Sequence, residues 1–345
     1  MNYWIKRLAT AFLSTLCSCG TPHIDKKYAA KVVKDALSLS CDVTAQKLSG
    51  GFTGAPLFKV TADTKHYVVR FLMHKTKKER EREIAILQIA SKGDYGPHVY
   101  FADVNRGVVI MEFLQQQPIE QQARQADSLH RLLAQLLQKI HQGPAFEAIE
   151  ERNVFNAIPA IIQNLQQHGS CNVPLKKLQD IVTIIHQAVA PSLISVPCHN
   201  DLHPSNLIFL VNCFKAIDYE RAAQADPYFD IAMVAYAYCE KPENERILLS
   251  TYLGRQPTEI EIAKLYLFKQ IAWMYCAVCF LTMIPDHLAN YDALKVSTYA
   301  DLWQERIDLE KPEHKLKFAK VLINHVIANV ASQGFANAIE LLHRK

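Results

Sequence analysis

The spacing of apolar residues changes about a third of the way along this chain of 345 residues. In the first part, short runs rich in Val, Phe and Tyr alternate with turn residues, which is typical of strands and hairpins. After about residue 119, apolar residues recur every three or four positions, which is typical of helices with one buried face. These two patterns therefore predict an α+β fold, with a small β-rich lobe ahead of a larger, mainly helical lobe.

The predicted elements follow these two patterns. Strand-like runs cover residues 42–48, 57–60, 66–72, 99–103 and 108–113, and helical patterns cover residues 28–37 and 75–90. Further along, helical patterns cover residues 129–140, 154–167, 175–189, 231–238, 259–283 and 316–342, and short β-like runs cover 207–210 and 214–217. We expect three regions: an apolar N-terminal segment over residues 1–26, a small lobe over 27–114 and a helical lobe over 115–345.

The N-terminal segment has two interpretations. Lys6 and Arg7 precede an apolar stretch over residues 8–16, and Cys17 and Cys19 follow it, as in a signal peptide or a lipoprotein processing site. The same residues fit an apolar helix that packs on the protein or lies on a membrane surface. The stretch is too short to span a bilayer. Any membrane association of the protein is expected through this segment only, and both interpretations stay open.

Charge and cysteine content argue against two classes of protein. The formal net charge of +4 is spread over many acidic and basic residues, with one short basic run over residues 75–82, so nucleic acid is not the expected partner. The nine cysteines are odd in number and scattered, which favours reduced thiols over a disulfide framework. Cys276 and Cys279 lie in an apolar helical run and are expected in the core. The pattern leaves the oligomeric state open.

The polar segment from Cys198 to Asn206, followed by Asp218, carries the clearest chemical signature. Asp201 and Asn206 stand five residues apart in one loop, and Asp218 follows twelve residues after Asn206, beyond a predicted pair of strands. Transfer of a phosphoryl group from ATP needs such a set, because one carboxylate must accept the proton of the attacking hydroxyl while an amide oxygen and a second carboxylate bind Mg²⁺. We therefore predict ATP and Mg²⁺ as cofactors.

Three motifs in this region resemble those of the aminoglycoside phosphotransferase and choline kinase superfamily. They are His-Asn-Asp-Leu-His-Pro-Ser-Asn-Leu-Ile from residue 199, Ile-Asp-Tyr-Glu from residue 217 and Ala-Asp-Pro-Tyr-Phe-Asp-Ile-Ala from residue 225. The resemblance covers about residues 45–285, and its Ile-Asp-Tyr-Glu step is closest to choline, ethanolamine and thiamine-type kinases. It implies a two-lobed, protein-kinase-like fold and an ATP-dependent kinase that phosphorylates the hydroxyl of a small alcohol.

The resemblance also implies roles for individual residues. Asp201 would be the general base, and His203 would orient it or contact the γ-phosphate. Asn206 and Asp218 would bind Mg²⁺. Asp230 would brace the catalytic loop through hydrogen bonds, and the alternative for this residue is an N-cap of the helix that follows.

The small lobe is expected to hold the nucleotide. Arg70 takes the place of the strand lysine that pairs with the α- and β-phosphates, and its expected ion-pair partner is Glu83. A Gly-rich turn resembles the phosphate loop of the superfamily, in which backbone N–H groups approach phosphate oxygens, although a plain hairpin is the alternative. Its candidate residues are Ser49, Gly50, Gly51, Phe52 and Thr53. The adenine-binding hinge is expected at the backbone of Glu112, Phe113 and Leu114.

Two residues are candidates for binding the acceptor. Trp273 shares a helical face with Tyr266 and Phe280 and offers its ring to a cation, and Glu220 offers a carboxylate, although core packing is the alternative for the aromatic stripe. We expect a small, cationic, choline-like alcohol, with an aminoglycoside as the alternative. A catalytically idle kinase-fold binding or effector protein is the competing class. Because the reaction uses ATP, the expected location is the cytoplasm, although the N-terminal segment leaves export open.

Overall fold

The computed structural model describes residues 24–48, 56–119, 126–146, 153–167, 172–284, 291–303 and 311–344. Two compact units make up the chain. The first contains the described residues within 1–119, 142–149 and 205–222, and the second contains the described residues within 120–141, 150–204 and 223–345. The N-terminal segment and the Gly-rich turn lie almost wholly outside the described residues.

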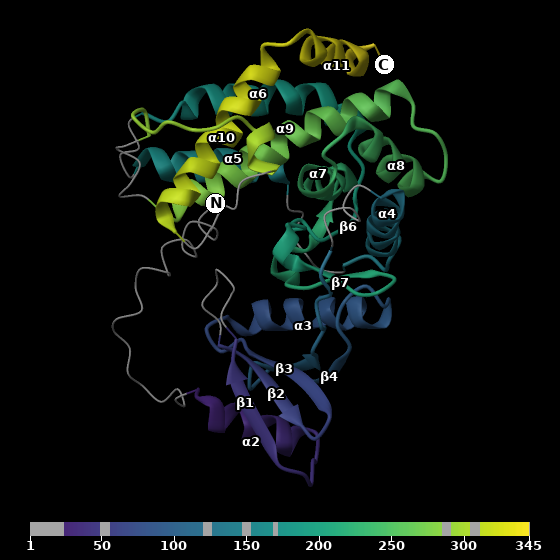
Figure 1. Cartoon of the computed structure of the whole chain (residues 1–345), viewed down its shortest axis with the longest axis vertical. Coiled ribbons are helices and arrows are strands. Elements are labelled where there is room, and N and C mark those ends of the chain that lie inside the picture. Colours follow the sequence, from purple (N-terminus) through teal and green to yellow (C-terminus); the bar gives the residue numbers. More distant parts are fainter. Residues whose placement is uncertain are drawn as a thin grey trace. The chain divides into compact units, whose positions relative to one another are not determined.

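A five-stranded antiparallel sheet forms the centre of the first unit, in the order β1-β2-β3-β5-β4 (Figure 1). The strands are β1 (Val43–Lys47), β2 (Leu57–Ala62), β3 (Lys65–Phe71), β4 (Val99–Asp103) and β5 (Val108–Glu112). The five strand-like runs of the sequence are therefore confirmed. Alternate residues of β2 are buried, as expected for a strand with one face toward a core.

One face of this sheet packs against a helix near the N-terminus. The helix α2 (Lys26–Ala36) begins at Asp25, whose side chain accepts a hydrogen bond from the backbone N–H of Tyr28. Its buried residues share a hydrophobic cluster with strand residues on the inner face of the sheet. The central members of the cluster are Ala29, Val32, Val33, Phe58, Val60, Val69 and Phe71.

A second helix of this unit, α3 (Lys77–Lys92), begins at a capping box. Thr76 accepts a hydrogen bond from the backbone N–H of Glu79, and the Glu79 side chain accepts one from the backbone N–H of Thr76. The helix contacts β4 and the short 3₁₀ helix η4 (Tyr219–Arg221). Its one buried acidic residue among the positions described is Glu83.

A small hairpin, β7 (Leu207–Phe209) with β8 (Phe214–Ala216), joins the same unit. The backbone N–H of Gln117 donates to the carbonyl of Phe209 at 2.9 Å, and the backbone N–H of Ala216 donates to the carbonyl of Tyr95 at 2.8 Å. The hydroxyl of Tyr219 donates to the same carbonyl at 3.0 Å. These bonds fix the hairpin to the region after β5 and to the end of α3.

Helices dominate the second unit. They are α4 (Asp127–His141), α5 (Val154–Gln167), α6 (Leu175–Val189), α7 (Pro227–Tyr238), α8 (Pro242–Leu253), α9 (Glu259–Thr282), α10 (Pro312–Val330) and α11 (Gln333–His343). A two-stranded ladder pairs β6 (Val196–Cys198) with β9 (Ala223–Ala225), and short 3₁₀ turns lie at Ala190–Ser192 and Ala300–Trp303. The 3₁₀ turn Pro204–Asn206 lies where the chain passes from the second unit to the first. Figure 1 shows α9 running through the helical unit with α7 and α10 beside it.

Two helical regions of this unit differ from the sequence prediction, and the β6–β9 ladder was not predicted either. The helix α8 was not predicted, because its buried positions Leu248 and Leu249 are adjacent and give little helical period. The predicted run over residues 316–342 is two helices, since Ser332 ends one and caps the next by accepting from the backbone N–H of Phe335.

The helix α9 is long and apolar enough, by length and composition, to cross a membrane. Of its most apolar 18-residue window, 67% is buried within the protein. Contacts with α5, α6, α7, α10 and α11 account for that burial. The apolar character of α9 is therefore explained by its place at the centre of the helical unit.

Candidate active site

The two predicted metal-binding residues lie at the same end of the small hairpin. Asn206 immediately precedes β7, and Asp218 follows β8 by one residue. Leu207 pairs with Ala216 in the ladder, and the backbone N–H of Ile217 donates to the carbonyl of Asn206 at 2.9 Å. Antiparallel pairing thus joins two residues that are twelve positions apart in the sequence.

Asp218 has an uncommon backbone conformation. Its φ is 63° and its ψ is 64°, in the left-handed region that residues other than glycine seldom occupy. Such conformations cost free energy and concentrate at functional sites. The Asp218 carboxylate accepts a hydrogen bond from Arg70 at 2.9 Å, and its side chain is 25% exposed.

Arg70 is buried near the end of β3 and lies among three carboxylates. Its guanidinium is 3.2 Å from Glu83, 2.9 Å from Asp218 and 3.8 Å from Glu220. Burial alone would lower the pKa of Arg70, but the charges of Asp218, Glu83 and Glu220 outweigh it and raise the pKa above its ordinary value. The predicted Arg70–Glu83 ion pair is confirmed, while the role of either residue toward phosphate stays a prediction.

A second buried cation, Lys75, joins this group. Its ammonium donates to Glu83 in a close contact and to Glu220 at 3.3 Å. The sequence prediction did not select Lys75, because it is one of several basic residues in the run over 75–82. It stands one residue before Thr76, the N-cap of α3, and its burial is decided by packing that the sequence does not show.

The candidate base and its neighbouring histidine belong to the second unit. Asp201 and His203 lie in the loop after β6, where the backbone N–H of His203 donates to the carbonyl of Asp201 at 2.9 Å. The His203 Nε2 atom is 4.0 Å from a carboxylate oxygen of Asp201. Both side chains are partly exposed, 17% for Asp201 and 27% for His203, so each is open to a ligand.

Asp230 holds this loop from α7. Its two carboxylate oxygens accept hydrogen bonds from the backbone N–H groups of His199 and Asn200, both at 2.7 Å. Asn200 has a φ of 60°, so this support coincides with a strained position next to Asp201. The predicted brace is therefore confirmed. The capping alternative is wrong, because Asp226 caps α7 by accepting from the backbone N–H of Tyr228.

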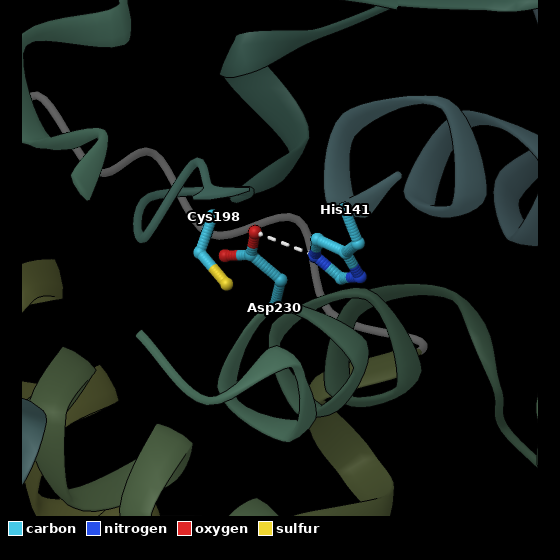
Figure 2. A group of neighbouring side chains, drawn as sticks. All are labelled: His141, Cys198 and Asp230. Atoms are coloured by element: carbon cyan, nitrogen blue, oxygen red, sulfur yellow. Dashed lines mark hydrogen bonds and ion pairs between the residues drawn. The ribbon is translucent and has the colours of Figure 1, made fainter. Parts of the chain in front are cut away.

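Figure 2 shows that His141 and Cys198 flank the Asp230 carboxylate. His141 Nε2 is 3.2 Å from Asp230, and its Nδ1 is 2.9 Å from the hydroxyl of Tyr252. Since a carboxylate can only accept, Nε2 of His141 donates to Asp230, while Nδ1 shares a hydrogen bond with the hydroxyl of Tyr252.

The same three side chains are close enough to hold a metal ion, since their ligand atoms lie within 4.8 Å of one another. Their chemistry argues for a hydrogen-bonded support instead. Asp230 already accepts two backbone N–H groups, and the Cys198 thiol lies 3.4 Å from the carbonyl of Ala225. Burial raises the pKa of Cys198 well above its ordinary value, which disfavours the thiolate that a metal needs.

The structure describes only some of the remaining residues that were predicted to bind the nucleotide. Ser49, Gly50, Gly51, Phe52 and Thr53 lie outside the described residues. At the predicted hinge, the backbone N–H of Glu112 donates to the carbonyl of His98 at 2.8 Å, and that of Phe113 donates to the carbonyl of His66 at 3.4 Å. The N–H groups of both residues are thus engaged within the sheet region, and the adenine contact of Glu112, Phe113 and Leu114 stays a prediction.

The two acceptor candidates lie in different surroundings. Glu220 contacts Lys75 and Arg70 in the first unit. Trp273 is 3% exposed in the second unit, where its ring packs edge-on against His325 at 4.5 Å between centroids. Lys269 places its ammonium 5.1 Å from the centre of the Trp273 ring. Trp273 therefore packs in the core, which was the alternative interpretation. A contact between Trp273 and an acceptor stays a prediction.

Solved structures with a similar fold are kinases and phosphotransferases. A choline kinase from Cryptosporidium parvum superposes with a TM-score of 0.66 at 15% identity, over 92% of this chain and 100% of that one. A choline/ethanolamine kinase family protein from Mesorhizobium loti gives 0.63 at 16% identity, over 87% and 92%. A spectinomycin phosphotransferase in complex with ADP and spectinomycin gives 0.56 at 15% identity, over 94% and 98%. The protein thus has the two-lobed kinase-like fold, as predicted.

Residues 44–260 match the phosphotransferase enzyme family, known as APH. This match covers more than half of the chain, so the chain belongs to that family. The predicted resemblance is confirmed. A search of curated protein sequences gives no match for this chain.

Proposed function

We propose that this protein transfers the γ-phosphoryl group of ATP to the hydroxyl of a small molecule. The observation that carries the proposal is the group formed by Asn206, Asp218 and Arg70. An asparagine and an aspartate lie at the same end of a hairpin, and a buried guanidinium bonds to the aspartate carboxylate. Such a group supplies oxygen ligands for a metal and hydrogen-bond donors for phosphate.

The residues at the hairpin end suit Mg²⁺ by their chemistry. Asn206 offers a neutral amide oxygen, Asp218 offers a carboxylate, and both are hard oxygen donors of the kind this ion prefers. When bound, the ion would neutralise charge on the phosphates. Arg70 then contributes a fixed positive charge, because its guanidinium stays protonated at every physiological pH.

Within this proposal Asp201 accepts the proton of the attacking hydroxyl. Its loop is fixed by the two hydrogen bonds to Asp230, and its carboxylate is partly exposed. A base with these properties is rigid in its backbone and accessible to a substrate hydroxyl. His203, 4.0 Å from Asp201, is positioned to orient that carboxylate.

For the acceptor, we propose a small cationic alcohol such as choline or ethanolamine. The Ile-Asp-Tyr-Glu motif and two similar structures, a choline kinase and a choline/ethanolamine kinase family protein, support this choice. The similar spectinomycin phosphotransferase supports an aminoglycoside as the second candidate. Glu220 offers a carboxylate to either kind of cation, while the buried Trp273 gives the first candidate no further support.

An acceptor screen tests the proposal. Purified full-length protein is incubated with ATP and Mg²⁺ and with choline, ethanolamine, thiamine or an aminoglycoside, and products are identified by mass spectrometry. We expect a phosphorylated alcohol and stoichiometric ADP from at least one small alcohol. Nucleotide binding without transfer to any of a broad set of alcohols would support the idle binding protein, and transfer to proteins alone would contradict a small-molecule acceptor.

The use of ATP also favours a cytoplasmic location, as the sequence led us to expect. Fractionation of cells that express the full chain tests this. The proposal holds if the protein is in the cytosolic fraction or on the cytoplasmic side of the membrane with residues 1–26 retained. Export with cleavage near Cys17 or Cys19 would contradict it.

A further inference from the structure

The candidate phosphate site holds a cation that neither the family motifs nor the proposed function uses. Lys75 lies in the turn between β3 and α3, where its backbone N–H donates to the carbonyl of Leu72 at 2.9 Å. Its side chain is 2% exposed. A lysine this deeply buried needs charged partners, because an unpaired ammonium in the interior is strongly unfavourable.

Those partners are carboxylates that Arg70 also contacts. Glu83 directs Oε1 to Arg70 at 3.2 Å and Oε2 to Lys75. Glu220 directs Oε2 to Lys75 at 3.3 Å and lies 3.8 Å from Arg70. Two cations and two carboxylates therefore alternate in a closed ring, and Asp218 is attached to it through Arg70 at 2.9 Å.

Sharing Glu83 between two cations changes what Arg70 can do. An arginine that faces a carboxylate alone tends to bind both oxygens through its planar fork, which commits two N–H groups to one partner. Lys75 occupies one oxygen of Glu83, so Arg70 keeps a single contact with that residue. The nitrogen that contacts Glu83, Nη1, also donates to Asp218 at 2.9 Å, and the other terminal nitrogen, Nη2, lies 3.8 Å from Glu220.

The net charge of this group also affects how it would bind a nucleotide. Arg70 and Lys75 supply two positive charges against the three carboxylates of Glu83, Asp218 and Glu220. Loss of Lys75 would leave one cation among three buried or partly buried carboxylates. A polyphosphate would then meet a more negative site, in surroundings where water screens charge poorly.

We propose that Lys75 is a positioning residue of the nucleotide site, which binds one oxygen of Glu83 and thereby keeps the Arg70 guanidinium available to phosphate oxygens. This inference rests on the proposed function. It assigns Lys75 an indirect role, carried through Glu83, and not a contact with substrate.

A double-mutant cycle on nucleotide binding tests the role. Lys75→Met removes the charge and keeps most of the side-chain volume, and the dissociation constant for ATP with Mg²⁺ is measured by calorimetry at a temperature where circular dichroism shows folded protein. We expect the dissociation constant to rise roughly ten- to hundredfold, the range for loss of a hydrogen bond to a charged group. Lys77→Met is the matched control, since Lys77 is 66% exposed at the start of α3, and it should leave the constant unchanged.

The Glu83→Gln background shows how Lys75 acts. An amide cannot hold Arg70 as a carboxylate does, so we expect Lys75→Met to change nucleotide affinity by less than about threefold in that background. If Lys75→Met alone does not fold, this comparison of Glu83→Gln with the double variant still stands. A merely structural lysine would lower the melting temperature and leave the dissociation constant unmoved.

Three results would overturn the proposal, and they are distinguishable. Wild-type affinity in Lys75→Met would show that Lys75 does not serve the site. An equal loss with and without Glu83→Gln would show that Lys75 acts through its own charge or its own phosphate contact, and not by positioning Arg70 through Glu83. A wild-type protein that binds no nucleotide would overturn the proposed function itself, and this inference with it.

Discussion

Asp218 joins three features that a structural aspartate seldom has together. It has a left-handed backbone, it accepts a hydrogen bond from a buried arginine, and it lies next to Asn206 through the β7–β8 pairing. A turn aspartate would account for the backbone alone. The arginine and the neighbouring amide are what a phosphate-bound metal site requires.

The Asp218→Ala variant should lose Mg²⁺-dependent nucleotide binding, because Asn206 alone offers one neutral oxygen to the ion. Calorimetric titration with ATP, in the presence of Mg²⁺ and then of a chelator, measures the difference. Wild type should bind far more tightly with Mg²⁺, whereas the variant should show little difference between the two conditions. The exposed residue Asp35 on α2 provides the control substitution to Ala. Normal Mg²⁺ dependence in Asp218→Ala would remove Asp218 from the metal site.

At the scale of elements, the loop that carries Asp201 depends on α7. Asp230 is fully buried, and its carboxylate satisfies two backbone N–H groups and His141. Tyr252 of α8 extends this chain of contacts by bonding to the far side of His141. The carboxylate therefore joins α4, α7 and the loop after β6, and α8 is attached to it through His141.

Asp230→Asn should destabilise the protein by about 3 kcal/mol, since the amide nitrogen would face a backbone N–H and leave buried donors unpaired. Urea unfolding followed by circular dichroism measures this loss. Asp180→Asn, at an exposed position of α6, is the matched control and should change little. A stability equal to wild type in Asp230→Asn would mean that the loop does not depend on this carboxylate.

Elements with a strong period were predictable, and those with a weak period were not. The strands β2 and β3 lie in runs rich in Val, Phe and Tyr, so they agree closely with the predicted runs, and β2 also alternates in burial. The helix α8 carries its signals in its ends, Pro242 at the first turn with Glu243 and Glu245 beside it, more than in its apolar pattern. The break at Ser332 is a local capping event inside a continuous helical period, which periodicity alone does not show.

Some residues of the candidate site were likewise predictable from the sequence, and others were not. Spacing within one loop predicted Asp201 and Asn206, and a fixed distance along the chain predicted Asp218. The resemblance to choline kinases implied the Arg70–Glu83 pair. Lys75 was not predicted, because its role depends on which of several lysines turns inward, and that is decided by tertiary packing.

At the scale of the whole molecule, a partly buried histidine predicts how stability depends on pH. His325 on α10 stacks on Tyr299 at 4.2 Å between centroids and packs against Trp273. Burial, with a smaller effect of the Lys269 charge, lowers the pKa of His325 to about 4. Its pKa in the unfolded chain is about 6.5.

The sign of the effect follows from these two values. Below about pH 6.5 the unfolded state binds a proton that the folded state does not, so stability falls as pH drops toward about 4 and then levels off. His325→Phe keeps an aromatic ring and cannot be protonated, so its melting temperature should fall less than that of wild type between pH 7 and pH 4.5. Parallel pH profiles for both proteins would contradict the buried, neutral state of His325.

The central claim is that Asp201 performs the chemistry while Asn206 and Asp218 bind the metal independently of it. Replacing Asp201 by Asn keeps the shape of the side chain and removes the basic oxygen. With the acceptor found in the screen, kcat should fall by roughly 10² or more, while the affinity for ATP with Mg²⁺ stays within a few-fold of wild type. An Asp201→Asn protein that keeps most of its kcat, or that loses nucleotide binding as well, would contradict this account.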